Sequence, residues 1–197
     1  MRIILASKSP RRREILTMLG VQFEIISADA DEYSTEKNPA ALVTELALRK
    51  GRAVRDLLIK QGEWSEDVLV IAADTVVAAA GEILGKPVNA ADAARMLRLL
   101  AGSTHEVLSG VALLCGTSEL TAAERTGVVF SQMSEADIAR YLASGEPFDK
   151  AGAYAVQGLA SLFIKGLDGD YFNVVGLPVY RLNTLVKELL GCTLTEL

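Results

Sequence analysis

The stretch VLVIAADTVVAAA, residues 68–80, decides the fold, because it is apolar over nearly its whole length and rich in β-branched residues. An apolar run of this length, followed directly by Gly81, is typical of a buried strand. One residue breaks the run. Asp74 is a carboxylate with apolar neighbours on both sides, so the same stretch that predicts a buried strand also contains its most anomalous side chain.

The segments on either side of this strand predict an alternation of helices and further strands. Helix starts are marked by Pro10, Asn38, Asn89 and Ser134, and Ser9 is expected to be the N-cap of the first helix. We expect strands at residues 2–6, 21–27, 106–114 and 121–130, and helices at 10–19, 39–61, 90–101, 135–144 and from 179 onward. We also expect a loop over 146–158 and a hairpin of 159–164 with 171–175 around Asp168-Gly169.

This order mixes βαβ units with hairpins, which predicts an α/β protein. We expect a mixed β-sheet with flanking helices and two lobes around a central cleft, with the middle hairpin in the second lobe. No repeat or obvious linker interrupts the chain, so residues 1–197 are predicted to form a single domain.

The composition excludes several classes of protein. The net charge of −5 makes a general nucleic-acid binder a poor candidate, and no apolar run reaches the roughly 20 residues that a membrane span requires. The two cysteines, Cys115 and Cys192, lie far apart and match no metal spacing. Without a disulfide framework we expect a reducing compartment and a cytoplasmic protein.

A basic cluster breaks the usual rule for helix starts. Arg11, Arg12 and Arg13, with Lys8 before them, lie at the positive end of a helix dipole, where acidic residues normally occur. A charge run is often only a solvated turn. Here the cluster follows a strand and a short serine-containing turn, and the free amides of a helix start already favour an anion. We therefore favour a site for a polyphosphate.

Lys50 and Asp74 also stand where folding alone would not place them. Lys50 projects from the apolar stripe of its helix, whereas Arg49 is expected to pair with Glu45, and Arg52 with Asp56. Lys50 either extends past the edge of the core or points a cation into a cleft. Asp74 needs a cation, a metal or protonation, and it is interpreted as a site carboxylate. Glu32, in an acidic loop, is the natural second acidic group.

Carboxylates combined with several cations indicate metal-assisted phosphate chemistry. Hard oxygen ligands favour a divalent cation, Mg²⁺ above others, with Asp74 and Glu32 as candidate ligands. The only histidine is His105, so a zinc site is disfavoured, and a structural, hydrogen-bonding role is expected for it. The chain contains neither a Gly-x-x-x-x-Gly-Lys-Ser/Thr loop nor a glycine-rich dinucleotide fingerprint.

Five motifs, taken together, resemble those of the Maf family. They are ASKSPRR (6–12), ADTVV (73–77), KP (86–87), DKAGAY (149–154) with QG (157–158), and NVVGLP (173–178). They span nearly the whole chain in the expected order. The resemblance implies a fold related to inosine triphosphate pyrophosphatases, a Maf-like domain over residues 1–197, and a homodimer.

The resemblance also implies an activity and a set of site residues. The activity is that of a nucleoside triphosphate pyrophosphatase, which releases a nucleoside monophosphate and pyrophosphate with the help of a divalent metal. The Gln157 position is similar to that of the branch acting on dTTP and UTP. The implied catalytic residues are Asp74, Glu32, Lys50 and Lys86, and the implied substrate-binding residues are Ser7, Arg11, Arg12, Thr75 and Gln157.

Two other classes of function remain alternatives at this stage. A non-catalytic nucleotide-sensing regulator of cell division would bind triphosphates without releasing pyrophosphate. An RNA-binding module would use the basic cluster, although a content of only 6% aromatic residues disfavours it. Whether Asp74 is a general base or a metal ligand, and whether the natural pyrimidine is modified, also stay open.

Overall fold

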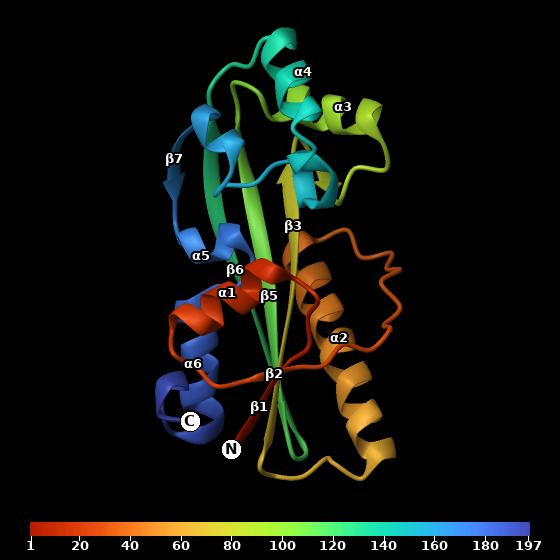
Figure 1. Cartoon of the computed structure of the whole chain (residues 1–197), viewed down its shortest axis with the longest axis vertical. Helices are drawn as coiled ribbons and strands as arrows, with labels where there is room; N and C mark the ends of the chain where they lie inside the picture. Colours follow the sequence, from red (N-terminus) through yellow and green to blue (C-terminus); the bar gives the residue numbers. More distant parts are fainter. The chain divides into compact units, whose positions relative to one another are not determined.

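A computed structural model describes residues 1–197 and shows a mixed α/β fold built on a seven-stranded sheet (Figure 1). The strand order is β2-β1-β3-β5-β6-β7, with β4 paired to β3. β1 pairs in parallel with β2 and β3, whereas the β3–β4 and β6–β7 pairs are antiparallel. The predicted mixed sheet with flanking helices is therefore confirmed.

The strands are β1 (Arg2–Leu5), β2 (Glu24–Ile25), β3 (Val68–Ala79), β4 (Glu82–Leu84), β5 (Thr104–Cys115), β6 (Ser118–Phe130) and β7 (Ile164–Asp168). The helices are α1 (Pro10–Met18), α2 (Pro39–Gln61), α3 (Ala90–Leu100), α4 (Glu135–Ala143), α5 (Tyr171–Val175) and α6 (Val179–Leu190). Short 3₁₀ helices are η1 (Glu146–Asp149), η2 (Ala151–Ala153), η3 (Leu159–Phe163) and η4 (Leu194–Glu196).

The chain divides into two compact units, which agrees with the expectation of two lobes. Unit 1 comprises residues 1–74, 109–124 and 176–197, and unit 2 comprises 75–108 and 125–175. The middle hairpin is not confined to the second lobe, because its turn and the adjoining parts of both strands, residues 109–124, belong to unit 1. The central strand β3 is shared, because its residues up to Asp74 belong to unit 1 and those from Thr75 belong to unit 2.

In unit 1 the long helix α2 covers one face of the sheet and helices α1 and α6 lie on the other (Figure 1). Asn38 caps α2 by accepting hydrogen bonds from the N–H groups of Ala40 and Ala41, and Gly62 ends it in the left-handed conformation. The apolar stripe of α2 packs on alternate residues of three strands. The buried residues of this contact, from the helix and the sheet together, are Ile4, Ala6, Ala47, Val54, Leu58, Val68, Val70, Ala72, Ala112 and Leu114.

Unit 2 has its own core, formed by α3 and α4 against β4, β5, β6 and the second half of β3. Asn89 caps α3, and Ser134 forms a capping box with Asp137 at the start of α4. β7 pairs with β6 at the outer edge, from Gly127 opposite Asp168 to Phe130 opposite Ile164. Both helix starts that the sequence marked with Asn89 and Ser134 are confirmed.

Two predicted segments have a secondary structure that differs from the expected one. The strand expected at 21–27 is reduced to Glu24–Ile25, because the N–H of Val21 closes the end of α1 on the carbonyl of Leu16. The loop expected at 146–158 contains the two 3₁₀ helices η1 and η2.

The prediction of a hairpin around Asp168-Gly169 is wrong. Residues 159–163 form a 3₁₀ helix, β7 pairs with β6, and residues 171–175 form α5. The reason lies in Asp170, whose carboxylate accepts from the N–H of Phe172, while its own N–H and carbonyl bind the hydroxyl of Thr126. These bonds start a helix where a hairpin would need a second strand.

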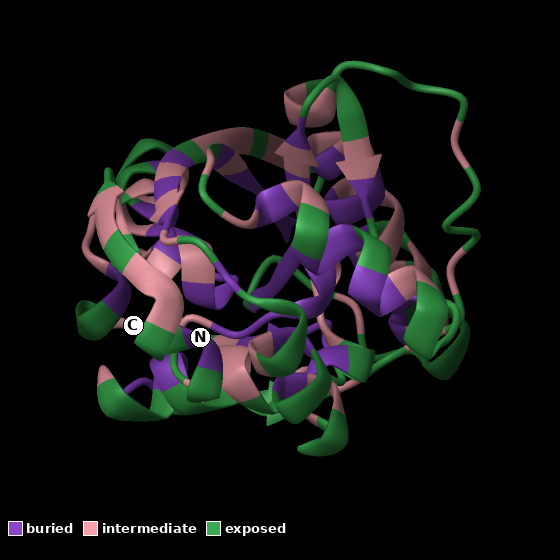
Figure 2. Cartoon of the chain, turned by 90° about the horizontal axis from the view of Figure 1, so that it is seen from above, coloured by how far each residue is buried: buried purple, intermediate pink, exposed green.

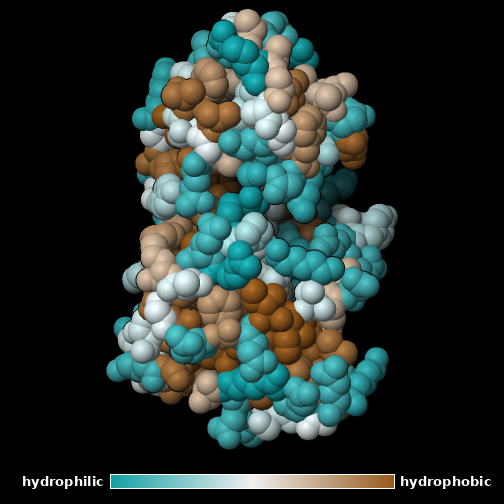
Figure 3. All heavy atoms as spheres, viewed as in Figure 1, coloured by the Kyte–Doolittle hydropathy of each residue, from teal (hydrophilic) through white to brown (hydrophobic).

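The face seen in Figure 3 carries both polar residues (teal) and apolar residues (brown), which are interspersed. None of the helices combines the length and apolarity that crossing a bilayer requires.

Candidate active site

Lys50 joins two of the predicted site carboxylates. Its Nζ lies 2.5 Å from Oδ1 of Asp74 on β3 and 3.0 Å from Oε1 of Glu32, in the connection between β2 and α2. The side chains of Lys50 and Asp74 are 20% and 13% exposed, whereas that of Glu32 is 66% exposed. Lys50 therefore does not extend into solvent past the core edge: it is the cation that Asp74 needs in an otherwise apolar strand.

The start of α1 holds Arg12 in place. Its Nε donates to the carbonyl of Gly176 at 2.8 Å, and its Nη1 donates to Oγ of Ser7 at 3.3 Å. Desolvation lowers the pKa of the half-buried Arg12 guanidinium, and the negative charges of Asp74 and Glu32 oppose this shift. Arg12 thus interacts electrostatically with Asp74 and Glu32, the two carboxylates that Lys50 contacts.

The capping prediction for α1 needs one correction. Ser9 occupies the N-cap position but makes no side-chain capping bond. Its N–H instead donates to Oγ of Ser7 at 3.1 Å, and Ser7 is itself buried. The serine that organises this turn is therefore Ser7, which two bonds hold beside Arg12.

The basic cluster divides between two environments. Arg11 and Arg12 are half-buried, and the charge of Arg11 contributes to lowering the pKa of Arg12. Lys8 and Arg13 are exposed, and Lys8 lies 3.9 Å from the carboxylate of Asp29. Lys8 and Arg13 therefore fit the alternative interpretation of the cluster as a solvated turn, whereas Arg12 does not.

The other three predicted site residues lie in unit 2. Thr75 is half-buried in β3, whereas Lys86 and Gln157 are exposed. The segments that carry Lys86 and Gln157 adjoin, because the N–H of Gly152 donates to the carbonyl of Gly85 at 3.0 Å. Unit 2 therefore presents a cation and an amide from neighbouring loops.

Glu146 supports the loop of Gln157. Its carboxylate accepts from the hydroxyl of Tyr141 at 2.7 Å and from the N–H of Leu159 at 2.9 Å. A Cβ at Gly158 would lie 2.2 Å from this carboxylate, so a larger residue beside Gln157 would require the side chain of Glu146 to shift. Neither Glu146 nor the carbonyl of Gly176 was identified as a functional candidate from the sequence, although Gly176 and Gly158 both lie within the quoted motifs.

His105 has the structural role expected of it. It is buried between Phe130 and Tyr154, with both ring contacts edge-on, and its Nε2 lies 2.8 Å from the hydroxyl of Tyr154. Burial lowers the pKa of His105 to about 4, so the ring is neutral at pH 7.

Two comparisons with known proteins indicate one family. The family of Maf-like proteins matches residues 2–189. A protein of Bacillus thuringiensis subsp. konkukian (strain 97-27), named dTTP/UTP pyrophosphatase, is 47% identical over 95% of this chain and 94% of its own length. A protein of Bacillus cereus (strain AH187) with the same name is 46% identical over the same shares.

Among solved structures, the Ham1 protein of Staphylococcus aureus matches 66% of this chain and 72% of its own chain, at 13% identity and a TM-score of 0.45. The match of the family over nearly the whole sequence, with close relatives of almost equal length, shows that this chain belongs to the Maf family.

Proposed function

We propose that this protein hydrolyses dTTP and UTP to the nucleoside monophosphate and pyrophosphate. The names of its relatives, at 46–47% identity over 95% of the chain, support the substrate class. The geometric observation that carries the proposal is the contact of one lysine, Lys50, with two carboxylates, whose charges also act on the half-buried Arg12. Cations and carboxylates in one cluster match the needs of phosphate hydrolysis.

The carboxylates of this cluster suit a divalent cation, and Mg²⁺ is the preferred candidate. Mg²⁺ in proteins is commonly bound by one or two carboxylates plus substrate phosphates. Asp74 and Glu32 supply two carboxylates that both contact Nζ of Lys50. We propose that these two residues hold it. When bound, it would supply positive charge to the phosphate oxygens and acidify a water molecule.

In the proposed reaction a water oxygen forms a bond to the α-phosphorus, and the bond from that phosphorus to the oxygen bridging to the β-phosphorus breaks. Pyrophosphate leaves with the bridging oxygen and its electron pair, and the proton that the attacking water loses passes to Asp74 where that residue is the general base, or to solvent where it is a metal ligand. Lys50 and Arg12, with Arg11 and Lys86, neutralise the triphosphate and the charge that develops on the leaving group. Ser7 keeps Arg12 oriented through its hydroxyl.

The test of the activity is pyrophosphate release with Mg²⁺ and a panel of dTTP, UTP, CTP, dATP and dGTP. We expect kcat/KM for dTTP and UTP to exceed that for the purines by on the order of 100-fold or more, because a site that hydrogen-bonds a base edge rejects bases lacking the matching groups. Binding of triphosphates without any pyrophosphate release would favour the regulator. Binding of RNA with a steep salt dependence would favour the nucleic-acid module.

Asp74 is proposed above as a metal ligand, and general base is its alternative role; one variant separates the two. Asp74→Asn is expected to lower kcat by about 10²- to 10⁴-fold if it removes the proton acceptor for the attacking water. Calorimetric titration with Mn²⁺ then distinguishes the roles. Unchanged Mn²⁺ affinity identifies a general base, whereas lost affinity identifies a metal ligand. Full turnover in Asp74→Asn would contradict both.

Gln157 and Thr75 are the proposed base-recognition residues. An amide offers a donor and an acceptor to the edge of uracil or thymine. Gln157→Ala should therefore reduce the preference for dTTP over dGTP about tenfold or more, since a bidentate pair of hydrogen bonds from one side chain to a base contributes about 1–3 kcal/mol of discrimination. Gln61→Ala, at the exposed end of α2, is the matched control. An unchanged preference in Gln157→Ala would remove the assignment.

The proposal also includes a cytoplasmic location and a homodimer. The location rests on the sequence, where two distant cysteines, both free in the structure, suit a reducing compartment. The homodimer rests on the resemblance to the family, and light scattering after size-exclusion chromatography tests it. Assays with modified pyrimidine triphosphates determine whether the preferred substrate is a normal or a damaged nucleotide.

A further inference from the structure

Glu32 lies in a part of the chain that has no regular structure. Residues 26–38 form neither helix nor strand, and in Figure 2 the loop is exposed along most of its length. A loop of this kind is free to take many conformations unless side chains hold its backbone. The contact between Glu32 and Lys50 therefore requires something that keeps Glu32 in place.

Arg49, the residue before Lys50 on α2, contacts the loop on both sides of Glu32. Its Nη1 donates to the carbonyl of Asp31 at 3.2 Å and to the carbonyl of Tyr33 at 2.6 Å. Two successive helix residues thus engage the same loop residue, with Arg49 on its flanking backbone and Lys50 on its carboxylate.

Glu45 completes the arrangement one turn earlier on α2. Its Oε1 accepts from Nη2 of Arg49, and its Oε2 accepts from Oγ of Ser34 at 3.1 Å. The hydroxyl of Ser34 in turn accepts from the N–H of Glu36 at 3.1 Å. Arg49 and Glu45 therefore act as one unit that binds the loop between Asp31 and Ser34.

We propose that Arg49 is a positioning residue for the reaction: it fixes the loop so that the carboxylate of Glu32 stays beside Lys50 and Asp74. The inference rests on the proposed function, in which Glu32 and Asp74 hold the divalent cation. Arg49 itself touches no reacting group. It acts through Glu32, as the partners that orient a metal-binding carboxylate commonly do.

The sequence alone suggests a weaker role for Arg49. At i,i+4 spacing, Glu45 and Arg49 form an ordinary helix surface pair, which has little effect on anything beyond the helix. The two carbonyl contacts distinguish the proposal from this alternative. A surface pair would leave the loop and its carboxylate unaffected when it is broken, whereas the positioning role predicts that both change.

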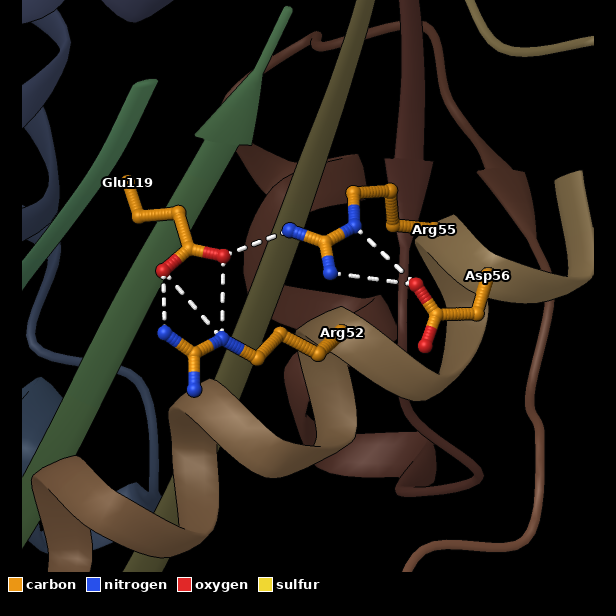
Figure 4. A network of polar contacts seen from close by, with 4 residues as sticks. All are labelled: Arg52, Arg55, Asp56 and Glu119. Atoms are coloured by element: carbon orange, nitrogen blue, oxygen red, sulfur yellow. Dashed lines mark hydrogen bonds and ion pairs between the residues drawn. The ribbon is translucent and has the colours of Figure 1, made fainter. Parts of the chain in front are cut away.

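The test compares Arg49→Met with Arg52→Met. Arg52 lies on the same helix and loses the same charge, but it binds the carboxylate of Glu119 on β6 together with Arg55 (Figure 4). Arg49→Lys is the conservative variant, because an ammonium reaches fewer of the acceptors than the guanidinium fork does. Thermal unfolding of each variant establishes that the comparison is made on folded protein.

Two readouts are measured. In pyrophosphate release from dTTP, Arg49→Met should raise the Mg²⁺ concentration for half-maximal rate, or lower kcat, by about 10-fold or more, with KM for dTTP changed much less. Arg52→Met should stay within about twofold in each parameter. Hydrogen exchange on the protein without metal or nucleotide should be about 10-fold faster at residues 29–37 in Arg49→Met, and unchanged there in Arg52→Met.

A double variant tests whether Arg49 acts through Glu32. Arg49→Met combined with Glu32→Gln should be no slower than Glu32→Gln alone, because the carboxylate that Arg49 positions is already gone. Additive losses, or unchanged exchange of residues 29–37 in Arg49→Met, would overturn the proposal. Wild-type protein that releases no pyrophosphate from any nucleotide would refute the proposed function, and the exchange experiment would still decide whether Arg49 holds the loop.

Discussion

Lys50 is the residue at which folding and chemistry meet. It lies 20% exposed on the core side of α2 and neutralises Asp74, whose own strand is otherwise apolar. Removing one member of a buried ion pair leaves the other charged and poorly solvated, whereas removing both is far less costly. The pair is therefore expected to affect both stability and turnover.

Lys50→Met should lower the free energy of unfolding by about 2 kcal/mol, since the partly exposed pair costs less to break than the 3–5 kcal/mol of a fully buried one. The double variant Lys50→Met with Asp74→Asn should recover part of this loss. Urea unfolding measures both. Lys60→Met, an exposed lysine at the end of the same helix, serves as the control. A double variant less stable than Lys50→Met would show that the pair is not the cause.

At the scale of elements, α2 approaches the sheet unusually closely. A Cβ at Gly110 of β5 would lie 2.2 Å from the backbone carbonyl oxygen of Val43, and one at Gly51 of α2 would lie 2.4 Å from Cδ1 of Leu114. One glycine on the strand and one on the helix thus allow the contact. Because α2 carries Lys50, its distance from the sheet also determines where that cation lies.

Gly110→Ala should lower the free energy of unfolding by about 3 kcal/mol, the upper part of the range for overpacking, because the obstacle is a helix backbone rather than a flexible side chain. Activity should fall as well, since α2 must move with Lys50. Gly166→Ala on β7 is the matched control: a Cβ there meets nothing within 4 Å, so a change of less than about 0.5 kcal/mol is expected. Equal effects of the two substitutions, measured by urea unfolding, would contradict the close-packing argument.

Local signals predicted most elements and failed where side chains compete with the backbone. Asn38, Asn89 and Ser134 marked helix starts correctly, because each capping bond joins residues only two or three positions apart. The Asp168-Gly169 dipeptide, in contrast, predicted a hairpin that the structure does not contain. The bonds between Asp170 and Thr126 are made across more than forty positions, and no local pattern announces them. The predicted pair of Arg52 with Asp56 is also wrong, since Arg52 binds Glu119 and Asp56 binds Arg55.

At the scale of the whole molecule, His105 should govern how the free energy of unfolding depends on pH in the mildly acidic range, between about pH 4 and 6.5. Burial lowers the pKa of His105 to about 4, from an ordinary value of 6.5. The unfolded chain therefore binds the proton more readily than the folded chain between these values. The contribution of the neutral ring is complete above about pH 6.5 and is lost as the pH falls toward 4.

From pH 7 to pH 5, wild type should lose about 2 kcal/mol of unfolding free energy from this group. His105→Gln, which keeps a hydrogen-bonding partner for Tyr154 and cannot titrate here, should lack this slope even if it is less stable at pH 7. Carboxylates such as Asp137, whose pKa is lowered to about 2 chiefly by its hydrogen bond with Ser134, contribute their losses only at lower pH. Parallel curves for both proteins in urea unfolding would exclude His105 as the source.

The amino-acid order was sufficient for the α/β class and for most helix and strand bounds, and it nominated the candidate residues, because apolar runs, caps and misplaced charges are local features of the chain. The motif pattern was also enough to suggest the family. The partners of those residues depended on folding. Asp74 lies next to Lys50 because α2 packs across β3, and Arg12 meets the carbonyl of Gly176 from the far end of the chain. Such contacts join distant positions, so their geometry follows from packing, which no stretch of sequence contains.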